Sequence, residues 1–299
     1  DSRAVANVVW GLGRSKARWV SLPEDVQDNL CERLELTSPW GPQALSSFLN
    51  GLRRAGARWK SLSPRLRAAV LATLPSALRG GASEHATATI LSSLGGLGVH
   101  YKELDDDCRL AVGETLSRVG TLFTRQGLSS SLNGLAKMSW PLHKHSPSTR
   151  EALDGALVRV LERAVKEEAS ITNARLACGL TWSLGQLEML WGTQESSVGS
   201  DMYLLYSDLV VLPESTRSLL MQALSLNLNS ANEQGVFSTL SGLAKMKASW
   251  AGIEKLQATL SHSLVKTAPS MRVQAVCSTL WALGSLGLDW AALEEIGVR

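Results

Sequence analysis

The chain lacks the features that would place it in a membrane, disulfide or zinc class. It contains no run of 18 apolar residues, so no segment is predicted to cross a membrane. Its four cysteines are Cys31, Cys108, Cys178 and Cys277. They lie too far apart for the spacing of a zinc site or a disulfide framework. We expect all four to be small buried hydrophobes in a reducing compartment.

Catalytic constellations are missing as well. The five histidines are scattered along the chain: His85, His100, His143, His145 and His262. We expect His143 and His145 to lie in a surface turn, because no cysteine or acidic residue stands near them. Glycine-rich residues 95–98 resemble a phosphate loop only in composition, since no strand precedes them. These absences predict a protein without catalytic activity, cofactor or metal.

The composition is that of a folded, mildly basic protein. Of 299 residues, 44% are hydrophobic and 19% are charged, which argues against a disordered chain. The net charge is +3, but residues 1–80 hold 12 Lys and Arg against 6 Asp and Glu. The basic residues are therefore concentrated in the first part of the chain.

The pattern Leu-x-x-Leu recurs about seven times and organises the chain. Its second leucine, which we call the anchor, is Leu12, Leu52, Leu94, Leu135, Leu184, Leu243 and Leu283. Successive anchors are separated by 40, 42, 41, 49, 59 and 40 residues. A period near 40 predicts an all-α fold, an α-solenoid of stacked helix-turn-helix repeats of about 40 residues.

Each repeat is predicted to hold an A helix, which carries the anchor, and a B helix that follows it. We expect one solenoid over residues 1–299, with approximate repeats 1–39, 40–80, 81–122, 123–171, 172–230, 231–269 and a partial repeat 270–299. The fifth repeat contains an apolar insertion, roughly residues 192–210. Because Asp1 already lies inside a repeat, we expect the sequence to be a piece of a longer protein.

Two positions recur around the anchor. The residue before it is small in every repeat: Gly11, Gly51, Ser93, Gly134, Ser183, Gly242 and Ala282. Glycine costs a helix about 1 kcal/mol relative to alanine, so its recurrence predicts a close approach of neighbouring A helices. Seven residues after the anchor is an aromatic position: Trp19, Trp59, Tyr101, Trp191, Trp250 and Trp290, with Leu142 in the fourth repeat. We predict that these side chains are buried between helices.

Four further positions of the A helix form what we call the polar band. They lie nine, five and two residues before the anchor and two after it, spacings that share one helical face. The first is Arg3, Gln43, His85, Gln126, Arg175, Gln234 and Gln274. The second is Asn7, Ser47, Thr89, Ser130, Gly179, Ser238 and Ser278. The third is Trp10, Asn50, Ser92, Asn133, Trp182, Ser241 and Trp281, and the fourth is Arg14, Arg54, Gly96, Lys137, Gln186, Lys245 and Ser285.

Stacking the A helices would align the polar band into a surface suited to RNA. Amides can read bases, aromatic rings can stack on them, and cations can meet phosphates. The candidate RNA-binding residues are Arg3, Trp10, Arg14, Gln43, Asn50, Arg54, His85, Gln126, Asn133, Lys137, Arg175, Trp182, Gln234, Lys245, Gln274 and Trp281. A solvated face with hydrogen bonds between helices is the alternative explanation of the same pattern.

The A helices resemble those of octotricopeptide repeats, most closely in Ala4–Gly13 and Val276–Leu286. These repeats are similar to the heptatricopeptide repeats of apicomplexan and related protists, whose proteins often end in a RAP domain. The resemblance covers the whole chain as a pattern, with a slightly longer period here. It implies a helical solenoid that binds mitochondrial or plastid RNA in transcript maturation, stability, translation or the holding of ribosomal RNA. No RAP domain is visible, so the resemblance implies no nuclease role.

We therefore expect a non-catalytic organellar RNA-binding protein, mitochondrial rather than plastid. Its expected partners are single-stranded or structured RNA, with ribosomal RNA and ribosomal or organellar proteins among them, and no membrane. The alternative is a protein-interaction scaffold of HEAT or armadillo type, which would place apolar pockets where the polar band lies. A third possibility, an enzyme subunit whose active domain lies outside this stretch, stays open.

Overall fold

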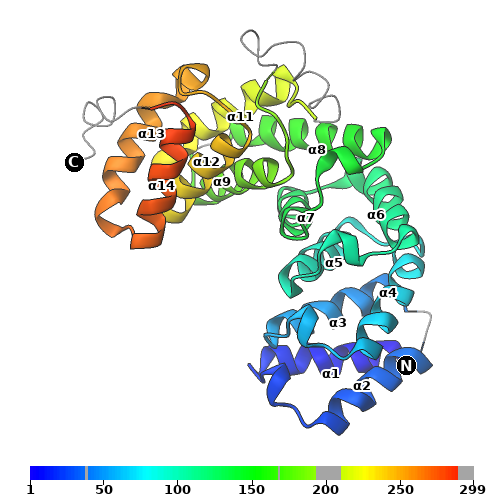
Figure 1. Cartoon of the computed structure of the whole chain (residues 1–299). Helices are drawn as coiled ribbons and strands as arrows, with labels where there is room; N and C mark the ends of the chain where they lie inside the picture. Colours follow the sequence, from blue (N-terminus) through cyan, green and yellow to red (C-terminus); the bar gives the residue numbers. More distant parts are fainter. Residues whose placement is uncertain (38–39, 168, 193–209, 289–299) are drawn as a thin grey trace, which may run out of the picture. The chain divides into compact units, whose positions relative to one another are not determined.

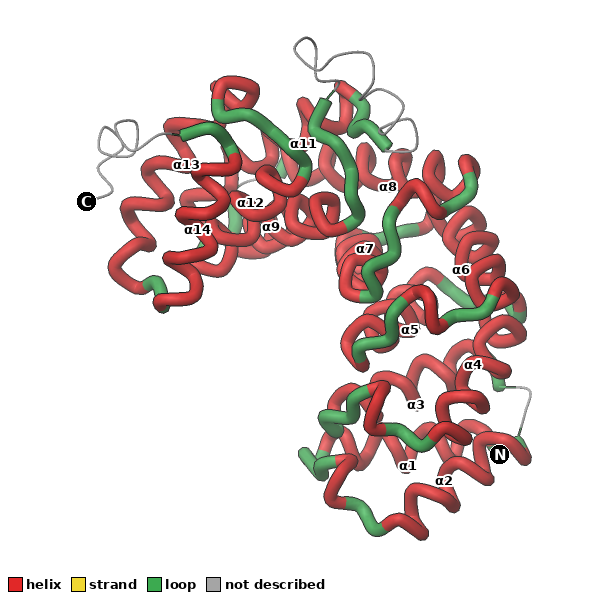
Figure 2. Tube along the Cα trace, viewed as in Figure 1, coloured by secondary structure: helices red, strands yellow, loops and turns green. Residues whose placement is uncertain are grey.

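The computed structural model describes residues 1–37, 40–167, 169–192 and 210–288, and these are mostly helical (Figures 1 and 2). Within them, the β structure is confined to one isolated bridge between Leu190 and Val211. The predicted fold class, an all-α solenoid of helical repeats, is confirmed. Trp290 and most of the insertion predicted at residues 192–210 lie outside the described residues.

The helices alternate as predicted. The A helices are α1 (Ser2–Arg14), α3 (Pro42–Arg54), α5 (Glu84–Leu97), α7 (Arg125–Lys137), α9 (Ile171–Gln186), α12 (Glu233–Lys245) and α14 (Val273–Ser285). The B helices are α2 (Glu24–Leu36), α4 (Pro64–Arg79), α6 (Asp106–Val119), α8 (Pro147–Lys166), α11 (Glu214–Asn227) and α13 (Glu254–Thr267). Helix α9 begins at Ile171, one residue before the predicted repeat 172–230. The exact repeat boundaries and the single solenoid over residues 1–299 stay predictions.

The chain forms two compact units. The N-terminal unit comprises residues 1–140 and 145–156, and the C-terminal unit comprises residues 141–144 and 157–299. In the N-terminal unit, α1, α3, α5 and α7 pack side by side as one layer, and α2, α4 and α6 form a second layer (Figure 1). In the C-terminal unit, α9, α12 and α14 form the A layer, and α11 and α13 pack together beside it. Within each unit, neighbouring A helices therefore present matching positions to each other.

Every A helix ends in the same turn. The residue four after the anchor has a positive φ in all seven repeats: Lys16, Gly56, Gly98, Ser139, Glu188, Lys247 and Gly287. The next residue donates its N–H to the anchor carbonyl at 3.0–3.3 Å, the bond that defines a Schellman turn. Four of the seven positions are not glycine, although a left-handed conformation costs such residues about 1–2 kcal/mol. This turn fixes where each chain segment leaves its A helix.

The aromatic position connects consecutive repeats through the backbone. The N–H of Trp19 donates to the carbonyl oxygen of Ala55 at 2.9 Å, and that of Tyr101 donates to Met138 at 2.9 Å. The N–H groups of Leu142, Trp191 and Trp250 donate equivalent bonds to the carbonyl oxygens of Leu187, Met246 and Leu286, respectively. The predicted burial is confirmed for Trp19, Trp59, Leu142 and Trp191, whereas Tyr101 and Trp250 are only half-buried. The aromatic position is therefore structural, but its burial varies between repeats.

Glycines alternate between odd and even repeats and bring the A helices together in pairs. Even repeats have glycine before the anchor (Gly51, Gly134, Gly242), and odd repeats have it after the anchor (Gly13, Gly95, Gly185, Gly284). A Cβ on Gly13, Gly95 or Gly185 would lie 2.6 Å from the carbonyl oxygen of Gly51, Gly134 or Gly242, respectively. We call these three contacts the glycine pairs. The predicted close approach holds there but is wrong for Gly11, which has no neighbouring atom within 4 Å.

Replacing Gly134 by alanine should destabilise the N-terminal unit by about 1–3 kcal/mol. The new Cβ would lie 2.5 Å from the backbone carbonyl of Leu91, so α5 and α7 would have to move apart. The control is Gly11→Ala at the same repeat position, where the space is open and the better helix propensity should stabilise by up to about 1 kcal/mol. Chemical denaturation measures both. Equal effects of the two substitutions would contradict the glycine-pair explanation.

Two sequence predictions about exposure are wrong. His145 is buried and stacks on Trp140 at 4.6 Å between ring centroids, so it does not lie in an exposed turn. His143 is also largely covered, and its Nδ1 lies 3.8 Å from the Glu188 carboxylate, a partner 45 residues away in the sequence. Cys277 is exposed on α14, whereas the other three cysteines are buried as predicted. Local sequence could not show these outcomes, because they depend on packing between elements.

Candidate nucleic-acid interface

The first position of the polar band faces solvent in every repeat. All seven side chains there are exposed: Arg3, Gln43, His85, Gln126, Arg175, Gln234 and Gln274. This position lies near the start of each A helix, where N-cap side chains such as Thr124 and Asn232 hold the first turn. The exposed row is therefore carried on regular, capped helices within each unit.

The third position alternates between flat rings and amides or hydroxyls. Trp10 and Trp281 are 37% and 54% exposed, and Trp182 is half-buried. Asn50 and Asn133 are half-buried, and the Asn50 Oδ1 accepts a hydrogen bond from Arg53 Nη2 at 2.8 Å. Ser241 is buried, so the band is interrupted on α12. The indoles belong to odd repeats and the asparagines to even ones.

The fourth position carries the predicted cations at the carboxyl ends of the A helices. Arg14, Arg54, Lys137 and Lys245 are all exposed. The Arg14 guanidinium lies 5.1 Å from the centroid of the Trp10 ring, in cation–π contact. Lys245 Nζ donates to Gln186 Oε1 at 2.7 Å, and partial burial lowers the pKa of this lysine. Because Gln186 occupies the same band position on α9, this bond joins equivalent positions of neighbouring A helices.

At the fourth band position, which forms a row of cations, the third repeat has Gly96 instead of a cation. The side chain of Arg53 occupies this place. A Cβ on Gly96 would lie 2.4 Å from Arg53 Cδ, so the arginine side chain crosses α5 at this glycine. Only a residue without a side chain leaves room for it. Arg53 lies one residue after the anchor of its own repeat, outside the four band positions, but next to Arg54, so the sequence also predicts it as an extension of this row. The structure adds it as a fifth cation of the surface.

A hollow of about 70 Å³ lies between α5 and α7 and is lined by band residues. Its walls include His85, Thr89 and Ser92 of the third repeat and Gln126 and Ser130 of the fourth. At one end, the Glu84 carboxylate accepts hydrogen bonds from the Thr124 N–H and hydroxyl at 3.2 and 2.8 Å. The lining of this hollow is predominantly polar. A larger hollow of about 270 Å³, lined by Ile171, Ala174 and Arg175 of α9 and by Ala231 and Gly235, is mostly apolar.

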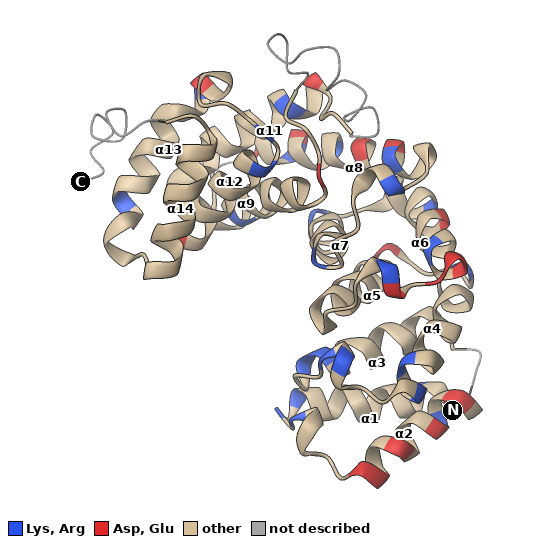
Figure 3. Ribbon diagram, viewed as in Figure 1, with Lys and Arg blue, Asp and Glu red and all other residues tan. Residues whose placement is uncertain are grey.

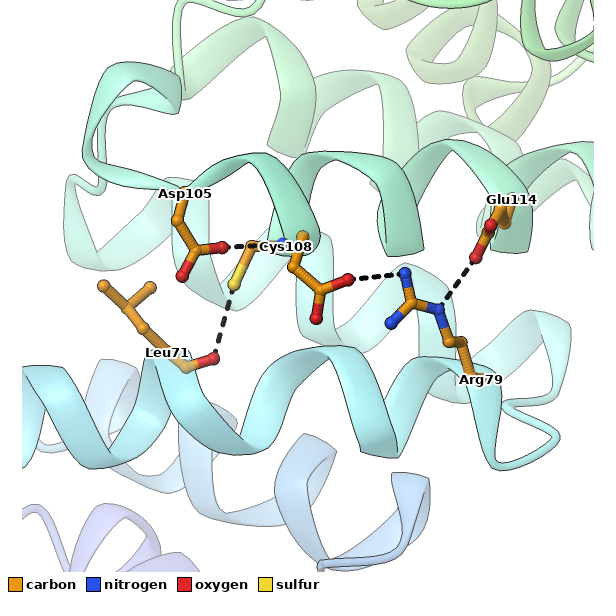
Figure 4. A network of polar contacts seen from close by, with 6 residues as sticks. Leu71, Arg79, Asp105, Cys108 and Glu114 are labelled. Carbon is orange, nitrogen blue, oxygen red and sulfur yellow. Dashed lines mark hydrogen bonds and ion pairs between the residues drawn. The ribbon is translucent and has the colours of Figure 1, made fainter.

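On the B helices, two arginines form ion pairs with carboxylates of a neighbouring repeat. Arg79 of α4 lies between two carboxylates of α6, 2.7 Å from Asp107 and 2.9 Å from Glu114, and these contacts raise its pKa (Figure 4). Arg65 of α4 likewise pairs with Glu35 of α2 at 2.6 Å. Acidic residues lie along α2 and α6 in Figure 3. Arg65 and Arg79 of the B layer are thus neutralised by carboxylates of neighbouring repeats.

The band cations have no such acidic neighbours among the described residues. None of the ion pairs between described residues includes Arg14, Arg54, Lys137 or Lys245. Arg14 contacts the Trp10 indole, Lys245 donates to the Gln186 amide, and the side chains of Arg54 and Lys137 are exposed to solvent. Figure 3 shows basic residues near α1 and α3. Charges held near neutral hydrogen-bonding groups remain available to an external anion. Arg14, Arg54, Lys137 and Lys245 are therefore exposed cations without an ion pair among the described residues.

The buried thiols are inert in this arrangement. Burial raises the pKa of Cys108 to about 12, and its Sγ donates to the Leu71 carbonyl at 3.3 Å (Figure 4). Burial also raises the pKa of Cys178 and Cys31. A thiol rather than a thiolate is expected at these three positions at neutral pH, which fits a packing role.

The described residues contain no cluster of three or more His, Cys, Asp or Glu able to hold a metal ion. No helix in the described ranges combines the length and apolarity needed to span a bilayer. No protein-family model matches the chain, and no curated protein matches it significantly.

Proposed function

We propose that the polar band of the A helices binds RNA and that the protein is a non-catalytic RNA-binding repeat protein. The observation that carries this proposal is the contrast between the two layers. Cations on the A helices lie beside indoles and amides, whereas B-helix cations such as Arg65 and Arg79 are paired with carboxylates. Rings, amides and uncompensated cations together suit bases and phosphates of single-stranded RNA.

The organelle and the kind of RNA rest on the resemblance of the A helices to octotricopeptide repeats. We propose a mitochondrial rather than a plastid location, with ribosomal RNA as one candidate ligand and ribosomal or organellar proteins as further partners. The scaffold alternative would use the same A layer for a protein. The polar α5–α7 hollow fits RNA, whereas the larger hollow beside Arg175, between α9 and the start of α12, is mostly apolar and fits the scaffold alternative.

The proposal is tested first by asking whether the purified chain carries nucleic acid. A ratio of absorbance at 260 and 280 nm well above that of pure protein, lowered by ribonuclease but not by deoxyribonuclease, is the expected result. A nucleic-acid-free preparation that also fails to bind added RNA at low salt would contradict the proposal. A preparation that captures a defined protein instead would favour the scaffold alternative.

Replacing Asn50 and Asn133 by alanine should change which RNA sequences bind best. A well-placed amide–base contact is worth about 1–3 kcal/mol of discrimination, and both side chains reach the band surface. The slope of log K against log salt should stay constant, because amides do not neutralise phosphates. The measurement is selection of RNA from a random pool, followed by titration. Ser241→Ala is the control, since that residue occupies the same position but is buried.

A further inference from the structure

The residues of the polar band repeat every two A helices. In the three even repeats, the first band position is always glutamine, the second is always serine and the fourth is always a cation. The members are Gln43, Ser47 and Arg54 on α3, Gln126, Ser130 and Lys137 on α7, and Gln234, Ser238 and Lys245 on α12. The odd helices of the glycine pairs vary at the same positions: Arg3, Asn7 and Arg14 on α1, His85, Thr89 and Gly96 on α5, and Arg175, Gly179 and Gln186 on α9. Each glycine pair therefore joins a constant helix to a variable one.

The glycine pairs bring the third band positions of their two helices together. A Cβ on Gly134 would lie 2.7 Å from the backbone nitrogen of Ser92, and Asn133 directly precedes Gly134. The equivalent distances are 2.7 Å between Gly51 and Trp10 and 2.9 Å between Gly242 and Trp182. The third-position residues therefore lie beside each other at each crossing, as Trp10 with Asn50, Ser92 with Asn133, and Trp182 with Ser241.

The cation of the even helix lies at the same crossing. The Cβ atoms of Arg54 and Lys137 lie 2.9 and 3.0 Å from the Cβ positions of Gly13 and Gly95 on the partner helices. In the third pair, Lys245 Nζ donates to Gln186 Oε1 of the partner helix at 2.7 Å. Each glycine pair thus gathers two third-position residues, one from each helix, and one cation into a single group.

A side chain, and not backbone contact, separates one glycine pair from the next. Where α3 meets α5, the side chain of Arg53 lies against Gly96, and its Nη2 donates to Asn50 Oδ1 at 2.8 Å. The other glycines of these two helices, Gly51 and Gly95, meet the backbones of α1 and α7 instead. The groups formed by the first and second glycine pairs are therefore distinct, with Arg53 between them.

We propose that each glycine pair binds one RNA base, so that the chain reads one base for every two repeats. This inference rests on the RNA-binding function proposed above. RNA combines a constant backbone with a variable base, and the constant cation, glutamine and serine of the even helices suit its phosphates and ribose hydroxyls. The odd helix selects the base, because it offers an indole for stacking in the first and third pairs and only Ser92 in the second. Asn50 and Asn133 hydrogen-bond to the edge of the bound base.

This arrangement leaves unread nucleotides between two bound bases. Packed helices lie about 8–10 Å apart, so the two glycine pairs of the N-terminal unit are separated by about 16–20 Å. A stacked nucleotide advances a strand by only about 3.4 Å. More than one nucleotide step therefore spans the distance from one bound base to the next.

Selection of RNA from a random pool by the wild-type chain tests this register without any substitution. The expected result is a set of preferred nucleotides separated by positions without preference. An uninterrupted run of preferred nucleotides, one for each repeat, would overturn the proposal and leave RNA binding intact, as would RNA binding with no preference at any position. A chain that binds no RNA would overturn both this proposal and the proposed function.

A double-mutant cycle at Ser92 tests whether the two helices of a pair share one base. Ser92→Trp gives the second pair the indole that the first pair has in Trp10, and RNA affinity should rise about tenfold through stacking. The gain should shrink at least about threefold in the Asn133→Ala background, because Asn133 belongs to the same pair. It should be unchanged in the Asn50→Ala background, because Asn50 belongs to another pair.

Asn50 is the matched control for Asn133. Both occupy the third band position, and both lie on helices that pack against α5. Circular dichroism and urea denaturation establish that each variant is folded. A gain that depends equally on the two asparagines, or no gain in a folded Ser92→Trp variant, would overturn the proposal.

Discussion

Replacing Trp59 by alanine is expected to lower the free energy of unfolding by about 3–5 kcal/mol, the usual cost of deleting a core aromatic. Trp59 is 2% exposed and begins the short 3₁₀ turn that joins α3 to α4. Removing its indole would leave a cavity between two helices that the surrounding backbone can close only in part. Urea denaturation followed by circular dichroism measures the loss.

Two further substitutions serve as controls for Trp59→Ala. Lys60→Ala changes the next residue of the same turn, which is exposed, and should alter stability by no more than about 0.5 kcal/mol. Alanine at the half-buried Tyr101 should cost less than at Trp59, because less of the ring is withdrawn from water. An unchanged unfolding midpoint for Trp59→Ala would mean that the aromatic position does not hold the repeats together.

Replacing Arg14, Arg54, Lys137 and Lys245 together by alanine should lower the magnitude of the salt slope of RNA binding by about 3. Each phosphate contact on a single strand contributes about 0.7 to the slope of log K against log salt through counterion release. Affinity should fall about equally for unrelated sequences, since phosphates carry no base identity. Salt titrations of wild type and quadruple variant give both quantities.

The control removes the same number of positive charges from the B helices. Arg33, Arg65, Lys166 and Lys255 lie on α2, α4, α8 and α13, and their replacement should leave most of the slope intact. Adding Arg53→Ala to the band variant should lower the slope further, because Arg53 crosses Gly96 within the same row. Equal losses from the band and B-helix variants would show that binding follows net charge and not the A layer.

The repeat pattern was readable because the same physical requirements recur in each unit. The anchor is buried in every repeat except the first, where Leu12 is half-buried, so the spacing of the anchors shows in the sequence. The exposure of the first and fourth band positions follows from helical periodicity alone. The alternation of glycine before and after the anchor was also present in the sequence, but its meaning needed the crossing geometry of Gly13 with Gly51.

Other features depend on tertiary packing and could not be predicted. The Schellman turn places Lys16, Ser139, Glu188 and Lys247 at positive φ. These residue types rarely adopt this conformation, so the sequence does not indicate it. Arg53 crosses to a neighbouring helix because Gly96 leaves space there. His145 is buried because Trp140 offers a ring surface, which no local pattern indicates. In each case, a contact between distant segments overrides the local preference.

Ultraviolet crosslinking of bound RNA, followed by mass spectrometry of the crosslinked peptides, tests the central claim most directly. The claim is that RNA lies along the polar band of the A helices. It predicts crosslinks in α1, α3, α7 and α12, at or beside residues such as Trp10, Asn50 and Lys137. Crosslinks confined to the B helices α2, α4, α6 and α13, with the A helices unlabelled, would contradict it.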